Sequence, residues 1–348
     1  MDMKNSVVER YTDGAEAVQP ALCCPVDYDA ALLKLLPQEV IDKDYGCGDP
    51  SRYVENGDVV LDLGSGSGKI CYMAAQLVGE TGRVIGVDMN DEMLALARKY
   101  QADMAEKLAG DKVSFVKGQI QDLTKSLENP HSSEPLIADN SVDLVLSNCV
   151  LNLVNDSDKK QLVEEIFRVV KPGGRIAISD IVADEAIPEH LKADPELWSG
   201  CISGSFLEDE FLESFKQVGF RAVKCDKWDA QPWQVVEGIE FRSVTITAVK
   251  GENLPCIDKG HAVIYKGPYA ETTDDEGHVF YRGKRMAVCE RTYQFLTTGP
   301  YGDDFIGIPP TLEKEGVEGC ALIIGTLRPA SETKGSVHHP AKQGGSCC

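Results

Sequence analysis

The glycine-rich segment Asp62-Leu63-Gly64-Ser65-Gly66-Ser67-Gly68 constrains the fold more than any other part of the sequence. It follows a short apolar run, 59–63, that predicts a buried strand, and it precedes a predicted helix over 69–78. Glycines at such a junction let the backbone turn sharply and approach a ligand closely. The spacing is neither the GxGxxG of dinucleotide-binding loops nor a phosphate-binding loop ending in GK[ST], so a cofactor without phosphates is favoured.

Strands and helices alternate on both sides of this loop. The apolar pattern predicts further strands at 83–88, 112–116, 142–147 and 175–179, and helices at 91–109, 159–170 and 209–218. A last pair of strands, 222–228 and 241–250, would close the sheet. This order predicts an α/β fold, a doubly wound, Rossmann-like sheet covered by helices on both faces.

The length of 348 residues suits two or three domains. We expect an N-terminal cysteine-bearing segment at 1–57, with a helical pattern from Asp29 to Val40, before the sheet domain at 58–250. Beyond it, short strands near 262–265, 278–281 and 286–289 predict a small C-terminal α+β domain at 251–328. Residues 329–348 are rich in Ser, Gly, Lys and His and predict a flexible tail ending in Cys347-Cys348.

The charge balance excludes several classes of partner. A net charge of −21 repels phosphate backbones and anionic lipids, and the basic residues are scattered rather than clustered. No apolar run approaches the roughly 18 residues of a membrane span, and residues 1–11 lack the apolar core of a signal peptide. We therefore expect a cytoplasmic protein without nucleic-acid or membrane partners, and a monomer.

Two further features accompany the glycine loop. Asp88 ends the next predicted strand, where a carboxylate can accept both hydroxyls of a ribose, and Val170-Lys171-Pro172-Gly173-Gly174-Arg175-Ile176 leads into the fifth strand. Together these residues resemble the class I S-adenosylmethionine methyltransferases over about 58–250. The resemblance implies S-adenosyl-L-methionine as cofactor, with Met89, Gln119 and Ile120 at its adenine and Asn148 near its sulfonium. It places Asp88 at the ribose, and against the methionine part Asp62, Gly64, Ser65, Gly66 and Gly68.

Twelve cysteines are many for a chain without a CxxC pair, and they indicate reduced thiols, some of them functional. Cys149 follows the fourth predicted strand directly, at the edge where ligands bind in such sheets. Cys201 is flanked by glycines, and Cys47 lies in a loop rich in turn formers. No histidine lies at that sheet edge to serve as a base. We expect the cysteines outside the site to be packing or surface thiols: Cys71, Cys225, Cys256, Cys289 and Cys320.

Three cysteine motifs, in this order around the glycine loop, resemble the arsenite methyltransferases: Tyr45-Gly46-Cys47-Gly48, Ser147-Asn148-Cys149-Val150 and Trp198-Ser199-Gly200-Cys201. This resemblance spans nearly the whole chain. It implies that Cys149 and Cys201, with Cys47, bind trivalent arsenic. It also implies a disulfide exchange between Cys47 and one of Cys23 or Cys24, reset by thioredoxin or glutathione, and mono- and dimethylated arsenicals as products. Glu240 stands where the family often has another cysteine.

The chemistry is consistent with these residues. Trivalent arsenic is soft, so thiolates can replace its oxygens while its lone pair stays free to attack the sulfonium methyl. The enzyme then mainly has to hold the two reactants in line, and no general base is required. Two alternatives remain open from the sequence. One is a methyltransferase of the same fold acting on a small organic acceptor such as a quinone or sterol ring, and the other is a non-catalytic protein that sequesters metalloids.

Overall fold

The computed structural model of the chain describes residues 3–19, 22, 26–252, 254–310, 316–318 and 325–333. The chain forms two compact units, Met1–Gly251 and Glu252–Cys348. The finer division into an N-terminal segment and a C-terminal tail stays a prediction. Within the described ranges, no helix is both long enough and apolar enough to cross a membrane.

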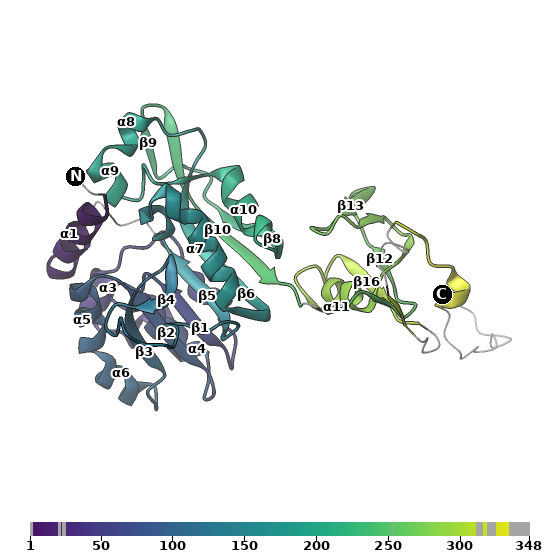
Figure 1. Cartoon of the computed structure of the whole chain (residues 1–348), viewed down its shortest axis with the longest axis horizontal. Coiled ribbons are helices and arrows are strands. Elements are labelled where there is room, and N and C mark those ends of the chain that lie inside the picture. The colour runs from purple at the N-terminus through teal and green to yellow at the C-terminus, as the bar shows by residue number, and fades with distance from the viewer. Residues whose placement is uncertain are drawn as a thin grey trace. The chain divides into compact units, whose positions relative to one another are not determined.

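The first unit is built on a ten-stranded sheet in the order β4-β3-β2-β1-β5-β6-β10-β8, with β7 beside β6 and β9 beside β10. The adjacent strands β3, β2, β1, β5 and β6 run parallel to one another. In contrast, β4, β8, β9 and β10 pair antiparallel with their neighbours. Figure 1 shows helices on both faces of this sheet. The strands are β1 (Val59–Leu63), β2 (Arg83–Asp88), β3 (Val113–Gln119), β4 (Asp122–Ser126), β5 (Val142–Asn148), β6 (Val170–Ala183), β7 (Phe206–Leu207), β8 (Phe220–Trp228), β9 (Gln234–Val236) and β10 (Ile239–Lys250).

The predicted Rossmann-like fold class is confirmed, and the strand order defines where a ligand binds. From β1 the chain adds β2 and β3 on one side and then crosses to β5 on the other, so the order reverses between β1 and β5. Ligands of such sheets bind outside the carboxyl ends of the strands at this reversal. The strand β6 is longer than the predicted 175–179, because it continues through Gly173 and Gly174, which interrupt the apolar pattern.

Of the helices covering the sheet, one begins with a side-chain cap. Asn90 caps α5, where its Oδ1 accepts from the N–H of Met93 at 3.0 Å. The single helix predicted over 91–109 is wrong: the chain leaves helical geometry at Tyr100 (φ −102°, ψ 1°), which divides it in two. These helices are α4 (Lys69–Leu77), α5 (Asp91–Lys99), α6 (Gln101–Lys107), α7 (Asp156–Val169) and α10 (Glu208–Gln217).

The segment before β1 is more helical than the sequence indicated. The pattern from Asp29 to Val40 is broken at Pro37, which cannot continue a helix and instead begins the next one. The N-terminal helix α1 was not predicted because most of its residues are polar. It packs against α9 and α5, and Figure 1 shows it beside α9. The short helices are α1 (Met3–Glu16), α2 (Ala30–Leu33), α3 (Gln38–Asp42), η2 (Pro50–Tyr53), η3 (Leu151–Leu153), α8 (Glu189–Lys192) and α9 (Pro195–Ser199).

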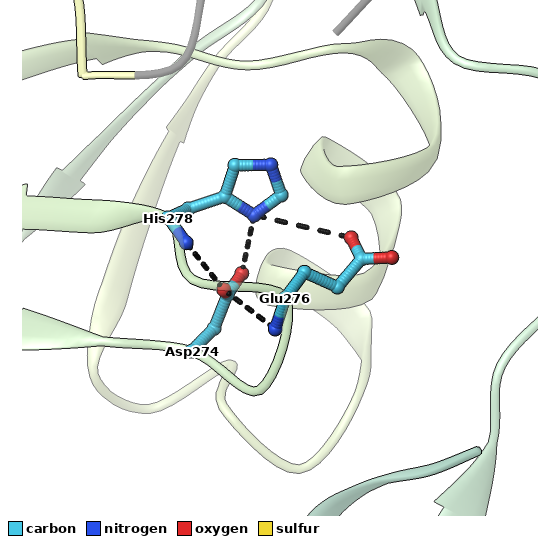
Figure 2. A group of neighbouring side chains, drawn as sticks. All are labelled: Asp274, Glu276 and His278. Carbon is cyan, nitrogen blue, oxygen red and sulfur yellow. Dashed lines mark hydrogen bonds and ion pairs between the residues drawn. The ribbon is translucent and has the colours of Figure 1, made fainter. Parts of the chain in front are cut away.

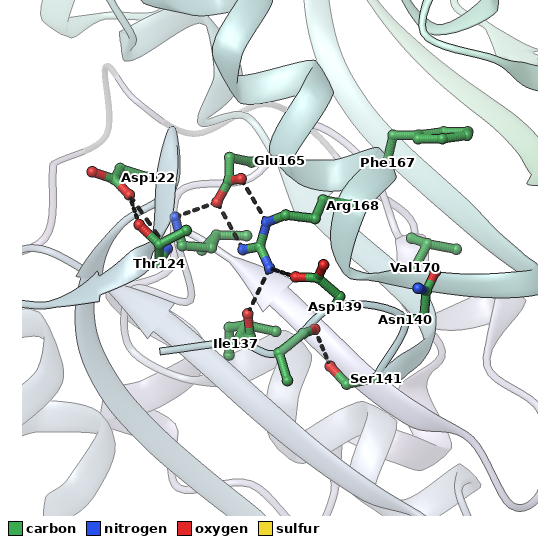
Figure 3. Close-up of polar contacts among 12 residues, drawn as sticks. Asp122, Thr124, Ile137, Asp139, Asn140, Ser141, Glu165, Phe167, Arg168 and Val170 are labelled. Carbon is green, nitrogen blue, oxygen red and sulfur yellow. Dashed lines mark hydrogen bonds and ion pairs between the residues drawn. The ribbon is translucent and has the colours of Figure 1, made fainter. Parts of the chain in front are cut away.

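A partly buried ion pair attaches α7 to the edge of the sheet (Figure 3). Glu165 accepts from the backbone N–H of Leu123 at 2.8 Å and from Nε of Arg168 at 2.7 Å. Arg168 Nη1 in turn donates to the carbonyl of Ile137 at 3.0 Å and to Asp139 at 2.6 Å. Glu165 thus fixes β4, and Arg168 fixes the segment that returns to β5.

The second unit contains a three-stranded antiparallel sheet, β15-β12-β16, whose buried side chains Val263 and Tyr265 share an apolar cluster with Phe280 of the hairpin β13-β14. This small sheet matches the predicted α+β character. The prediction that Cys256 is a free packing or surface thiol is wrong, because this cysteine is disulfide-bonded. The elements are β11 (Ile257–Asp258), β12 (Ala262–Tyr265), β13 (Glu271–Thr273), β14 (Val279–Tyr281), β15 (Arg285–Ala287), α11 (Glu290–Thr298), β16 (Phe305–Ile308), β17 (Val317–Glu318) and η5 (Ala330–Glu332).

The turn between β13 and β14 is fixed by its own side chains (Figure 2). Asp274 accepts from the N–H groups of Glu276 and His278 and pairs with Nδ1 of His278 at 2.7 Å. Arg291, on α11, forms an ion pair with Glu276 at 2.8 Å. These contacts tie the hairpin to the helix, and the arginine neutralises the glutamate.

Candidate active site

A cavity opens at the carboxyl ends of β1 and β5, where the strand order reverses. It encloses about 1070 Å³ of empty space, part of it open to solvent. Of the residues predicted to bind the cofactor, those lining this cavity are Asp62, Gly64, Ser65, Gly66, Asp88, Met89, Ile120 and Asn148.

The glycine loop after β1 needs its glycines. Gly64 (φ 70°), Gly66 (φ 50°) and Gly68 (φ 86°) all have left-handed backbone, which other residues adopt at a cost. A Cβ on Gly64 would lie 2.5 Å from a methyl carbon of Val150, so the loop also packs too closely for a side chain there. Gly68 does not line the cavity; it starts α4 and lets the helix approach Phe115.

Two carboxyl groups flank the loop, that of Asp62 buried and that of Asp88 partly buried. Burial raises the pKa of Asp62 to about 7, although the thiol of Cys71 donates to it at 3.2 Å. Burial also raises the pKa of Asp88, against the opposing effect of N–H groups from Asn90 and Gly66, which donate at 2.9 and 2.8 Å. Both carboxyls face a cavity in which a cationic or hydroxyl-bearing ligand would stabilise their charged form.

The hydroxyl of Ser65 supports the same interpretation. Its Oγ is buried and has no hydrogen-bond partner among the residues that the structure describes. Buried polar atoms are normally satisfied, so such an atom on a cavity wall indicates that a ligand supplies the partner. Ser65 and the two carboxylates thus fit the amino, carboxylate and ribose groups of S-adenosylmethionine.

Asn148 lies on the cavity wall, but its side chain is committed to the loop that carries Cys47. Its Oδ1 accepts from the N–H groups of Cys47 at 2.9 Å and Gly48 at 3.0 Å, and its Nδ2 donates to the carbonyl of Gly48 at 2.9 Å. Gly46 leaves room for this contact, because a Cβ there would lie 2.0 Å from Nδ2. The asparagine therefore joins the thiol loop to the end of β5.

Three of the predicted thiols belong to one buried cluster. Cys47, Cys149 and Cys201 are 1%, 6% and 4% exposed and pack with the same apolar residues beside β6 and β10. Cys149 lines the cavity directly, and the Sγ of Cys201 donates to its carbonyl at 3.2 Å. The structure thus brings together residues as far apart in the sequence as Cys47 and Cys201.

Cys149 and Cys201 share an unusual backbone conformation. Their φ angles are 62° and 61°, in the left-handed region where a residue with a Cβ is strained. Such strain costs on the order of 1 kcal/mol per residue and persists where surrounding contacts enforce it, often at functional sites. The N–H of Cys149 is held by the carbonyl of Ser179 at 2.8 Å, and that of Cys201 by Trp198 at 3.1 Å.

The other residues singled out from the sequence have different outcomes. Cys23, Cys24 and the Cys347-Cys348 pair fall outside the described residues. Gln119 is the last residue of β3 rather than following it, and Gln121 lines the cavity in its place. The side chain of Glu240 is partly exposed and pairs with Arg242.

The sequence analysis missed the contribution of α1. Lys4, Val7, Val8 and Tyr11 of this helix line the cavity, which the loop residues Asp44 and Tyr45 also reach. The helical spacing of Val7, Val8, Tyr11 and Ala15 was the available signal. Tyr11 is partly buried, and desolvation raises its pKa well above the ordinary value, with the thiol of Cys201 adding to the shift.

A parallel sheet with this glycine loop, an acidic residue ending β2 and a cavity at the reversal of strand order defines a class I S-adenosylmethionine-dependent methyltransferase. The model of a methyltransferase domain matches residues 54–219. The arsenite methyltransferase of Aquipseudomonas alcaligenes is 34% identical over 322 residues, 87% of this chain and 89% of that protein. The chain therefore belongs to the arsenite methyltransferase family.

Two further comparisons extend over both units. The arsenite methyltransferase of Mus musculus is 32% identical over 340 residues, which make up 91% of this chain and 86% of the mouse protein. The crystal structure of an arsenic(III) S-adenosylmethionine methyltransferase from Chlamydomonas reinhardtii is 30% identical, with a TM-score of 0.60 over 87% of this chain and 99% of that one. Residues 252–338 match a domain of unknown function.

Proposed function

We propose that the protein methylates trivalent arsenic with S-adenosylmethionine and releases mono- and dimethylated arsenicals. The observation that carries this proposal is the buried cluster of Cys47, Cys149 and Cys201 at the end of β5, with Cys149 on the cavity wall. A methyltransferase for a quinone or a sterol ring has no evident use for three such thiols. A protein that only sequesters arsenic has no evident use for the glycine loop.

Arsenic would enter by exchanging its oxygen ligands for thiolates. Each As–OH group condenses with one cysteine thiol, so that an As–S bond forms and the hydroxyl leaves with the thiol proton as water. Soft thiolates bind soft trivalent arsenic well, and three of them fill its coordination positions while the lone pair remains free. The strained backbone at Cys149 and Cys201 would keep their sulfurs in a fixed arrangement at the cavity.

The cofactor supplies an electrophilic methyl group on a sulfonium. The chain's own residues position it: Asp88 would accept the ribose hydroxyls, Asp62 and Ser65 would hold the methionine end, and Met89 would contact the adenine. The apolar cluster around the thiols would keep water from the reacting atoms. Because the arsenic lone pair is already available, the site has to provide alignment rather than a base.

Methylation oxidises arsenic, which has to be reduced before the next cycle. A free thiol attacks the sulfur of one arsenic-bound cysteine: a disulfide forms, the thiol releases its proton, and the As–S bond breaks with its electron pair left on arsenic, which restores the trivalent state. We assign this exchange to Cys47 with one of Cys23 or Cys24, by the family resemblance. Thioredoxin or glutathione would then reduce the disulfide, as expected in the reducing cytosol, where we place the protein as a monomer.

The decisive experiment is arsenic speciation after incubation with arsenite, S-adenosylmethionine and glutathione. We expect methylated products from the wild type, and at least a 100-fold loss in Cys149→Ser and Cys201→Ser. Cys225→Ser is the matched control, because that thiol is exposed and lies outside the cluster. Unmodified arsenite as the only species, from folded protein that binds the cofactor, would reject the proposal. Full activity of both serine variants would point to another acceptor.

A further inference from the structure

The N-terminal helix α1 joins the cofactor side of the cavity to the helix that precedes Cys201. On one side, Nδ2 of Asn90 donates to the carbonyl of Val8 at 3.2 Å. On the other, Nη1 of Arg10 donates to the carbonyl of Glu196, on α9, at 2.7 Å. Figure 1 shows α1 beside α9 within the first unit. A displacement of α1 would therefore disturb both its contact with Asn90 and its contact with α9.

Tyr11 makes the direct contact between α1 and a thiol. Its hydroxyl lies 3.7 Å from Sγ of Cys201, and its ring packs edge-on against Tyr45, with centroids 6.1 Å apart. Sγ of Cys201 is also the donor to the carbonyl of Cys149 at 3.2 Å. Because a thiol carries a single hydrogen, which is directed at that carbonyl, the tyrosine hydroxyl is the donor to the sulfur. Cys201 is thus held from both sides.

The same helix forms part of the cavity wall through Lys4, Val7, Val8 and Tyr11. A ligand filling the cavity therefore contacts the helix that holds Cys201. We propose that Tyr11 is a positioning residue for Cys201, and that it transmits occupation of the cofactor cavity to the reactivity of this thiol. The inference rests on the proposed function only in treating Cys201 as a reacting thiol.

Such coupling has a reciprocal consequence. If the cofactor changes the affinity of Cys201 for its ligand by some factor, that ligand changes the affinity for the cofactor by the same factor. Cys201 would then be held in one fixed arrangement mainly when the cavity is occupied, which orients its sulfur for the acceptor and protects it from other electrophiles. Such coupling would be useful because the proposed acceptor, trivalent arsenic, binds thiols readily even when the cofactor is absent.

The test measures alkylation of Cys201 by N-ethylmaleimide in the full chain, with and without saturating S-adenosylhomocysteine, by mass spectrometry of the Cys201 peptide. In the wild type we expect the nucleoside to slow alkylation at least tenfold. Tyr11→Phe keeps the ring and removes only the hydroxyl. One hydrogen bond contributes about 1 kcal/mol, so we expect about a three- to tenfold change in the unprotected rate. Protection by the nucleoside should fall to less than threefold.

Tyr53→Phe is the matched control, because its hydroxyl donates to Asp226, away from the thiols. It should behave as the wild type. Arg10→Gln weakens the attachment of α1 to α9 and should also reduce the protection, while calorimetry shows cofactor binding intact. Equal alkylation and equal protection in Tyr11→Phe and the wild type would overturn the inference, even if arsenite is methylated. The predicted alkylation pattern without arsenite methylation would instead refute the proposed function and leave the coupling standing.

Discussion

Asn148 fixes the backbone of Cys47 across 101 residues of sequence: its Oδ1 accepts from the N–H of Cys47 at 2.9 Å. The same oxygen accepts from Gly48 at 3.0 Å, and Nδ2 returns a hydrogen bond to the carbonyl of Gly48. Because Asn148 directly precedes Cys149, this one side chain sets the relative position of two of the three clustered thiols.

Asn148→Ala should therefore separate the thiols as well as weaken the fold. It leaves two N–H groups and one carbonyl without their partner, and we expect a loss of about 2–4 kcal/mol in the free energy of unfolding by urea. Arsenite methylation should fall at least tenfold at temperatures where the variant is folded. Asn129→Ala, in an exposed loop, is the control. Unchanged activity in Asn148→Ala would show that this contact does not order Cys47.

Asp62 should make the stability of the cofactor-free protein fall between about pH 4 and pH 7. The folded protein holds the proton of Asp62 up to a pKa of about 7, whereas the unfolded chain releases it near pH 4. In this interval the folded state binds more protons, so raising the pH favours unfolding, by on the order of 4 kcal/mol in total.

Asp62→Asn removes this ionisation. Urea unfolding should show the variant to be more stable than the wild type at pH 8, and the difference should vanish below about pH 4. Its affinity for S-adenosylmethionine should fall at least tenfold, since an uncharged amide replaces a carboxylate facing the cavity. A parallel pH dependence of stability in the two proteins would contradict the assignment of the buried proton to Asp62.

The sequence was sufficient for the parts of the fold that local patterns determine. Buried parallel strands such as 59–63 are short apolar runs, and the glycine loop between strand and helix has few alternative conformations. The same patterns placed Asp88 and Cys149 at strand ends, which the topology brings to one edge. Tyr100 was missed as a break because neither proline nor glycine marks it.

The remainder of the site depends on contacts between distant segments. Tyr11 approaches Cys201 only after α1 packs against α9, and the polar sequence of α1 gives little indication of that burial. Asn148 lines the cavity, and nothing in the local sequence indicates that its amide is also bonded to a loop 100 residues earlier. Such pairings depend on tertiary packing, which local propensity does not report.

The left-handed backbone at Cys149 can be tested by comparing glycine with alanine. Both Cys149→Gly and Cys149→Ala remove the sulfur and should abolish methylation. Glycine adopts a φ of 62° without strain, whereas alanine does not, so the glycine variant should be more stable by about 1 kcal/mol in urea unfolding. At an ordinary helical or extended position the order would be reversed. Equal or greater stability of the alanine variant would show that the backbone at 149 relaxes readily.

Glu165 should influence cofactor binding from outside the cavity. It holds the N–H of Leu123, in the strand that directly follows the cavity residues Ile120 and Gln121 (Figure 3). Glu165→Gln keeps an acceptor for that N–H but loses the ion pair with Arg168, so we expect a loss of about 1–3 kcal/mol in stability.

Calorimetry should also show a three- to tenfold weaker affinity of Glu165→Gln for S-adenosylhomocysteine, as a rough consequence of a less ordered cavity edge. The neighbouring Glu164→Gln is the control, because Glu164 is exposed and only reaches Lys160 at 3.6 Å; it should change stability by less than about 0.5 kcal/mol. A destabilised Glu165→Gln with unchanged cofactor affinity would mean that the segment at 120–121 is held by the cavity itself rather than by α7.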